Sequence, residues 1–209
     1  MANVGSLQWQ PSLLDAVNSV PNFDATFERV RRIHLERRAW VEHCALWVSA
    51  ADVLFTEIVA CAPWEQRRVH MYDRMVDEPR LSAWYGRALD DETIPPVVTS
   101  MASALSQRYG RTFDSVGAAL YRDGSDSVAW HGDRIPPEVI EPVVAIVSLG
   151  SPRKLRLRSQ QRRGDTRTFT LLPGELFVMG GTTQRTWQHS IPKVKSAGPR
   201  LSLQFRHAD

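Results

Sequence analysis

From residue 115 onward the chain is a series of short apolar or alternating runs separated by glycine, proline, aspartate and serine. Each run has the length and composition of a β-strand. The runs cover residues 115–122, 126–133, 143–150, 154–159, 167–174, 176–181, 182–191 and 200–207. About eight short strands of this kind are typical of a jelly roll. The sequence therefore predicts a strand-rich sandwich or barrel in its second half.

Two earlier segments have the apolar spacing of amphipathic helices. In residues 51–60 the apolar positions recur at helical intervals, Asp52 is placed to cap the N-terminus, and Pro63 ends the helix. In residues 95–110 the apolar side chains share one face, and Gly110 supplies the C-terminal stop. Helices ahead of a run of strands indicate an α+β fold, with the helices flanking the jelly-roll core.

The 209 residues contain no internal repeat and no long linker, so we expect one domain spanning 1–209. Within it, 119–206 forms the jelly-roll core, 46–118 supplies the helices, and 1–45 packs on the core as an N-terminal extension. Part of that extension, 23–40, is charge-rich and fits either a helix or a strand.

Composition is that of an ordinary globular protein, with 43% apolar and 23% charged residues. No window approaches 18 consecutive apolar residues, and the N-terminus lacks the charged and apolar regions of a secretory signal. Two cysteines, Cys44 and Cys61, do not make a disulfide framework. We therefore expect a cytoplasmic protein without a membrane partner.

The most informative side chains lie at the ends of two predicted strands. His131 and Asp133 are two residues apart, so in an extended segment they face the same side and can bind one metal ion together. His189 ends a later run and can supply a third ligand. Two histidines and one carboxylate form the facial triad of non-haem Fe(II) oxygenases. The alternatives are a structural histidine beside an aspartate, and a zinc hydrolase with the same three ligands.

The last predicted strand places four polar residues on one face and three apolar residues on the other. The polar residues are Arg200, Ser202, Gln204 and Arg206, and the apolar residues are Leu201, Leu203 and Phe205. An arginine that faces into a barrel is costly unless it is paired. A dicarboxylate co-substrate would provide that pair through a bidentate contact, whereas an exposed sheet edge would need none.

At these positions the chain resembles the AlkB-type 2-oxoglutarate- and Fe(II)-dependent dioxygenases, which repair alkylated nucleic acids. The matching segments contain the His-x-Asp motif, the distant histidine and the Arg-x5-Arg pair in the same order. They are residues 121–133, 144–158, 172–193 and 198–206, with 71–86 similar to the family's nucleotide-recognition segment. The resemblance covers 46–206 and implies a double-stranded β-helix, the jelly roll of this family.

The resemblance assigns roles to individual residues. His131, Asp133 and His189 would bind Fe(II) as the catalytic metal, with O2 as the oxidant. Arg200 would pair with the distal carboxylate of 2-oxoglutarate, Tyr121 would hydrogen-bond the co-substrate, and Arg206 would set the adjoining network. Trp84 or Tyr85 would stack on the target base. The implied activity is oxidative demethylation of N-alkylated bases, with release of formaldehyde, succinate and CO2.

A basic segment, 151–167, reads as a hairpin that turns near Gly164. We interpret it as a phosphate-contacting hairpin, to which Arg153, Arg162 and Arg163 belong, with its leucines facing the opposite way. A solvated edge hairpin is the alternative. The expected partner is alkylated nucleic acid, with DNA favoured over RNA, and the expected state is a monomer.

Three positions depart from the family pattern: Ala119 and Ser202 replace asparagines near the co-substrate, and Ile135 replaces an acidic residue that helps read the base. The preferred base therefore stays open. A dioxygenase of the same fold that acts on a tRNA base, a protein or a small molecule is the alternative function. A non-enzymatic nucleic-acid-binding module is a further alternative, which would need a broken triad.

Overall fold

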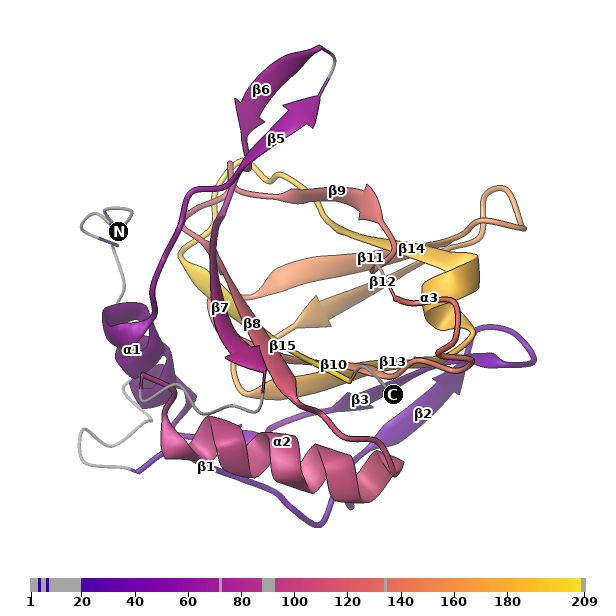
Figure 1. Cartoon of the computed structure of the whole chain (residues 1–209), viewed down its shortest axis with the longest axis horizontal. Helices are drawn as coiled ribbons and strands as arrows, with labels where there is room; N and C mark the ends of the chain where they lie inside the picture. The colour runs from indigo at the N-terminus through magenta and orange to yellow at the C-terminus, as the bar shows by residue number, and fades with distance from the viewer. Residues whose placement is uncertain are drawn as a thin grey trace.

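Two antiparallel sheets form the core of the protein, seen in a computed structural model that describes residues 4, 7, 20–71, 73–87, 93–133 and 135–207. The larger sheet has the strand order β2 (Arg31–His34), β3 (Ala39–Cys44), β13 (Glu175–Gly181), β10 (Val144–Gly150), β15 (Arg200–Arg206), β8 (Ser115–Tyr121) and β7 (Leu81–Arg87). The smaller sheet faces it (Figure 1), in the order β12 (Thr166–Leu171), β11 (Arg153–Ser159), β14 (Trp187–Ile191) and β9 (Val128–His131). The predicted jelly-roll core is confirmed.

The interior between the two sheets is apolar, and both sheets contribute to it. Its buried members include Ile146, Leu155, Leu157, Phe177 and Trp187. Because successive side chains of a strand face opposite sides, β11 alternates between buried and more exposed positions along its length. The strand faces that meet between the sheets therefore form one apolar core, and the candidate site lies within it.

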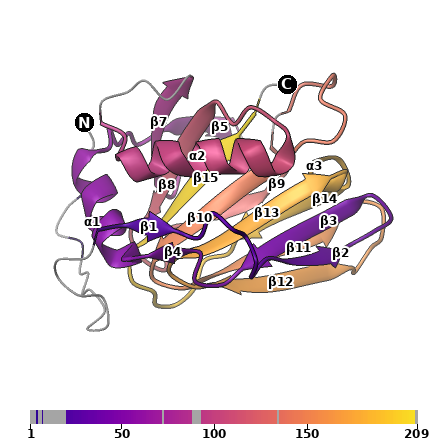
Figure 2. The same cartoon turned by 90° about the horizontal axis from the view of Figure 1, so that it is seen from below.

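Helices cover the other face of the larger sheet (Figure 2). The helix α1 (Ala51–Cys61) buries Leu54, Phe55 and Ile58, and α2 (Pro96–Tyr109) buries Val98, Met101 and Leu105. These side chains join Leu201, Leu203 and Phe205 of β15 in one cluster. Both predicted helices are confirmed to within one residue at each end, and Gly110 ends α2 in the left-handed conformation, with φ of 61°.

The structure differs from the sequence prediction at the start of α1. Ala50, with φ of 50°, occupies the N-cap position, and no side chain caps the helix there. Asp52 lies inside the first turn instead. In the first turn a carboxylate is stabilised by the positive end of the helix dipole.

The segment 182–191, predicted as one strand, begins with the short helix α3 (Thr183–Thr186) and only then becomes β14. Thr183 anchors this turn, since its hydroxyl donates to the carbonyl oxygen of Gly180 at 2.7 Å, with the carbonyl oxygen of Trp40 at 2.9 Å as the alternative acceptor. In the charge-rich 23–40 region, β2 belongs to the larger sheet, and the following β3 pairs with β13. Strand formation thus begins well before residue 119.

Two small two-stranded sheets complete the fold. The strands β1 (Asn22–Phe23) and β4 (Val48–Ser49) pair beneath α2, while β5 (Arg68–Met71) and β6 (Arg74–Asp77) project beside β9 (Figure 1). Of these two sheets only β5–β6 is a hairpin. None of the helices described above is long and apolar enough to cross a membrane.

Candidate active site

Three potential metal ligands meet at one edge of the smaller sheet. His131 ends β9, Asp133 follows two residues later, and His189 lies in β14 directly opposite His131 in the strand register. The two imidazole centroids are 4.2 Å apart. One ligand atom from each of the three residues lies within 4.8 Å of the other two. Strand pairing therefore brings together two histidines that are 58 residues apart in the sequence.

A β-bulge in β9 directs the side chain of His131 toward Asp133 and His189. Val128 pairs with Ile191 and His131 pairs with His189, so a three-residue step on β9 opposes a two-residue step on β14. Both Val128 and His131 consequently line the interior cavity. Without the bulge, strand alternation would place these two side chains on opposite faces.

The protonation states suit a divalent cation. The Nδ1 atom of His131 lies 2.8 Å from the carbonyl oxygen of Ala129, so Nδ1–H donates there and Nε2 keeps its lone pair. Burial lowers the pKa of His189 to about 4, although Asp133 opposes that shift. Burial raises the pKa of Asp133, but Arg206 and His189 outweigh it, and the net pKa is below the usual value. Two imidazoles and a carboxylate fit Fe(II).

Asp133 is held from two directions. Its Oδ1 accepts a 2.8 Å hydrogen bond from Nη2 of Arg206, and its backbone N–H donates to Oε1 of Gln184 at 3.2 Å. The second carboxylate oxygen, Oδ2, is buried and accepts no hydrogen bond from the residues that the structure describes. That oxygen lies 4.0 Å from Nε2 of His189, where a shared metal ion would satisfy both atoms.

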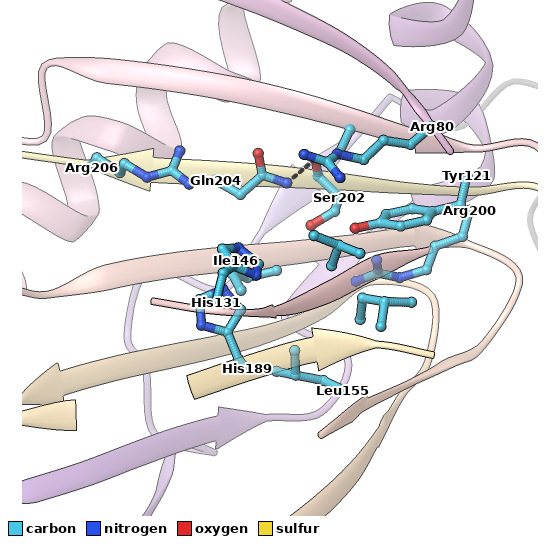
Figure 3. A pocket seen from close by; sticks show the side chains of 13 residues that line it. Arg80, Tyr121, His131, Ile146, Leu155, His189, Arg200, Ser202, Gln204 and Arg206 are labelled. Carbon is cyan, nitrogen blue, oxygen red and sulfur yellow. Dashed lines mark hydrogen bonds between the residues drawn. The ribbon is translucent and has the colours of Figure 1, made fainter. Parts of the chain in front are cut away.

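A cavity of about 90 Å³ extends from the two histidines to Arg200 and Tyr121 (Figure 3). Its apolar walls include Ile146 and Leu155, and β15 supplies the polar side. Arg200, Ser202, Gln204 and Arg206 all line it, while the three intervening residues of β15 are buried on the opposite face. The predicted alternation along this strand is confirmed.

Arg200 is 1% exposed, and its guanidinium is incompletely paired. Its Nε donates to Oγ of Ser148 at 3.0 Å, but Nη1 is buried with no hydrogen-bond partner among the described residues. Burial lowers its pKa to about 10, with Tyr121 opposing, so the side chain keeps its charge at pH 7. Tyr121 is its cross-strand neighbour, with Cζ of Arg200 5.3 Å from the ring centroid. A buried guanidinium that forms no ion pair with a described carboxylate is suited to the carboxylate of a ligand.

Arg153 does not lie where the sequence interpretation put it. It is 3% exposed and shares the inner face of β11 with Leu155 and Leu157, because residues two apart in a strand point the same way. Its guanidinium donates to three backbone carbonyl oxygens, those of Asp123, Asp126 and Pro192. The prediction of a phosphate contact at this residue is therefore wrong.

The two aromatic residues predicted near the base separate by strand alternation. Trp84 is 45% exposed on β7, whereas Tyr85 is 1% exposed and packs in the core beneath α1 and α2. A side chain in that core cannot stack on a base, so the prediction for Tyr85 is wrong. Trp84 keeps a surface position in which stacking is sterically possible.

The predicted basic hairpin exists as β11 and β12, with Gly164 at φ of 88° in the turn. Arg162 and Arg163 are exposed in that turn and form no ion pair with any described residue. Of the three departures from the family pattern, Ala119 and Ser202 line the cavity, while the Ile135 side chain packs against the inter-sheet core.

Sequence reasoning missed three contributors to the site. Ser148 orients Arg200, Gln184 holds the backbone of Asp133, and Arg80 lines the cavity. Ser148 and Gln184 come from β10 and α3, and their partners lie at least 51 residues away in the sequence. Nothing in their local sequence marks them, since only the sheet pairing creates the contact.

A groove of about 950 Å³ opens over His131 and Asp133, between β9 and the β5–β6 hairpin. Six basic residues line it against two acidic ones: Arg67, Arg68, Arg80, Arg156, Lys193 and Arg206 against Glu78 and Asp133. Such an excess of positive charge complements a polyanion.

The chain is similar to proteins of a known oxygenase superfamily. Residues 48–206 match the 2OG-Fe(II) oxygenase superfamily. The alpha-ketoglutarate-dependent dioxygenase alkB homolog 3 of Bos taurus is 33% identical over 177 residues, and that of Homo sapiens is 32% identical; both matches cover 76% of this chain. The chain spans 62% of the length of these relatives.

Two further matches extend this comparison. The DNA oxidative demethylase ALKBH2 of Homo sapiens is 29% identical over 179 residues, which cover 76% of this chain and 69% of that relative. The solved structure of OsALKBH1 superposes with a TM-score of 0.59 and covers 85% of this chain and 100% of its own, at 14% identity. That likeness supports the jelly-roll assignment.

Proposed function

The chain belongs to the 2OG-Fe(II) oxygenase superfamily, and from this premise we propose that it oxidatively removes alkyl groups from nitrogen atoms of nucleobases. The observation that carries the proposal is the single cavity that joins the His131, Asp133 and His189 cluster to the buried guanidinium of Arg200. Its relatives are named as dioxygenases of the alkB type and as DNA oxidative demethylases.

The proposed division of labour follows from the geometry. His131, Asp133 and His189 would hold Fe(II), which together with 2-oxoglutarate and O2 supplies oxidation of a methyl C–H bond. Arg200 would hold the distal carboxylate of 2-oxoglutarate through its unpaired Nη1. Tyr121 borders the same end of the cavity, and Arg206 acts through Oδ1 of Asp133. The apolar side chains of Ile146 and Leu155 would limit the access of water to the reacting groups.

The nucleic-acid substrate would bind in the groove over the proposed metal ligands. Bases inside a duplex cannot reach a buried centre, so the target must be single-stranded or flipped out. Trp84, exposed on β7, would stack on the base, and the exposed Arg162 and Arg163 would contact phosphates. We propose DNA as the preferred nucleic acid and a monomer as the working state.

The structure offers a reason to prefer this function over hydrolysis by zinc at the same ligands. A zinc hydrolase needs only a bound water beside its three ligands. It would leave the guanidinium of Arg200 buried without a counter-charge, which is costly. A 2-oxoglutarate carboxylate removes that cost.

The decisive experiment is mass spectrometry of N-methylated oligonucleotides after incubation with the protein, Fe(II), 2-oxoglutarate and ascorbate. We expect loss of the methyl mass together with formation of succinate and formaldehyde. Asp133→Ala should give no product while keeping the wild-type melting temperature within a few degrees. Succinate formation without loss of methyl from any oligonucleotide would instead support action on another substrate, and absence of both products would overturn the enzymatic assignment.

A further inference from the structure

Trp130 lies on the outer face of the smaller sheet, outside both hydrophobic clusters that the described residues form. The bulge in β9 directs Val128 and His131 into the cavity and leaves Trp130 facing the opposite way. Its side chain is half-buried, and its charged neighbours lie on β11. A large aromatic ring among charged groups, away from either core, is an informative exception to ordinary packing.

Two arginines of β11 approach the indole. Cζ of Arg158 lies 4.6 Å from the ring centroid and Cζ of Arg156 lies 5.4 Å from it, both within cation–π range. The Arg158 guanidinium is fixed by two hydrogen bonds, from Nε and Nη2 to Oε1 of Gln188, at 2.9 and 2.7 Å. Three adjacent strands thus hold the indole and the two cations together.

The positive charge of this face is not compensated. Arg156 and Arg158, and Lys154 on the same face of β11, form no ion pair with any carboxylate in the part of the chain that the structure describes. An aromatic surface flanked by uncompensated cations is the arrangement that binds single-stranded nucleic acid, where bases stack and phosphates pair with the cations.

This face is continuous with the proposed catalytic centre. The groove of about 950 Å³ that contains His131 and Asp133 is also lined by Trp130, Arg156 and Lys193. A strand whose target base enters the cavity can therefore pass along β9 and onto the outer face of the smaller sheet without leaving the protein surface.

We propose that Trp130, Arg156 and Arg158 form a nucleotide subsite for single-stranded nucleic acid, which binds a base flanking the target base. The flanking base stacks on the indole, and the neighbouring phosphates contact the two guanidiniums. The location of the target base rests on the proposed function. Binding at the subsite does not require turnover, so it can be tested separately.

The test is equilibrium binding of an unmodified, fluorescently labelled thymidine oligonucleotide to the full chain, followed by anisotropy at several salt concentrations. Trp130→Ala should weaken binding by about 5- to 100-fold without changing the salt slope, because stacking displaces no counterion. Trp130→Phe should retain most of the affinity. The double variant Arg156→Ala/Arg158→Ala should weaken binding and also lower the salt slope by about one to two.

The matched control is Arg31→Ala/Arg37→Ala, which removes two exposed positive charges at β2 and the turn that follows it, the far edge of the larger sheet. It should leave the affinity within about twofold of wild type. Binding by Trp130→Ala as tight as that of wild type, or equal losses in the two arginine double variants, would overturn the subsite.

A second measurement covers the case in which Trp130→Ala does not fold. Photo-crosslinking of the wild-type chain to an iodouracil oligonucleotide, followed by trypsin digestion, should label the peptide 123–134, which contains Trp130. Labelling confined to other peptides would contradict the proposal. Neither binding result depends on demethylation, so failure of the proposed chemistry would be recognised separately, as absence of product.

Discussion

Arg206 donates a 2.8 Å hydrogen bond from Nη2 to Oδ1 of Asp133 and leaves Oδ2 of the same carboxylate for another partner. The bond joins β15, the last strand along the chain, to the loop that follows β9. It fixes the rotation of the carboxylate, so that Oδ2 points toward His189. Arg206 is thus a positioning residue, which acts through a proposed metal ligand.

Loss of this contact should weaken metal binding. We expect Arg206→Ala to lower the affinity for Fe(II), or for Mn(II) as an air-stable substitute, by about 10- to 100-fold, as is typical when the partner of a ligand is removed. Calorimetric titration of the metal measures this directly. Arg206→Lys, which keeps the charge, should recover part of the loss. Unchanged metal affinity in Arg206→Ala would contradict the positioning role.

Arg200 controls the opposite end of the cavity. Arg200→Ala should raise the KM for 2-oxoglutarate by about 100-fold or more, because a buried charge-assisted pair with a carboxylate is lost. Ser148→Ala, which removes only the hydrogen bond that orients Arg200, should give a rise of about tenfold or less. Steady-state kinetics with varied 2-oxoglutarate checks both variants, and a wild-type KM in Arg200→Ala would refute the assignment.

Arg153 should contribute to stability rather than to nucleic-acid binding. Arg153→Ala leaves three buried or part-buried carbonyl oxygens without their donor, and we expect a loss of about 2–4 kcal/mol in the free energy of unfolding. The neighbouring exposed Lys154→Ala should change it by less than about 0.5 kcal/mol. Urea denaturation measures both. If Arg153→Ala left the free energy of unfolding unchanged, these hydrogen bonds would contribute little to stability.

The hairpin turn should contribute charge to nucleic-acid binding. Arg162→Ala/Arg163→Ala should weaken binding uniformly across sequences and reduce the slope of log K against log salt by about one to two. Titrations at several salt concentrations give the slope. An unaltered slope would mean that the turn does not contact phosphate.

Trp84 and Tyr85 are adjacent in the sequence, yet substitution of Trp84 should affect substrate binding and substitution of Tyr85 should affect stability. Trp84→Ala should raise the KM for a methylated oligonucleotide by about 5- to 100-fold with little change in stability, because the side chain is half exposed. Tyr85→Ala should lower the free energy of unfolding by about 3–5 kcal/mol, because it empties space in the core. Oligonucleotide kinetics and urea denaturation separate the two, and a stability loss in Trp84→Ala would undermine its surface role.

Local rules predicted much of the fold from the sequence. Apolar periodicity placed α1 and α2 to within a residue, and alternation correctly divided β15 into a polar face toward the cavity and an apolar face toward the helices. The same alternation places Arg153 on the inner face of β11 with Leu155, two residues away. The wrong prediction of a phosphate contact for Arg153 was therefore avoidable from the sequence alone. The cap at Ala50 depends on a left-handed backbone that no residue type there indicates.

The sequence by itself determined which side chains can perform the chemistry: two histidines, an aspartate and an inward-facing arginine, in a chain patterned for paired sheets. Only the tertiary structure decided which of them meet, because the register between β9 and β14 and the bulge within β9 set His131 against His189. It also decided which neighbours complete them, such as Ser148 for Arg200 and Gln184 for Asp133. Strand pairing is long-range, and a shift of one residue reverses every side chain's face, so spacing along the chain does not encode these contacts.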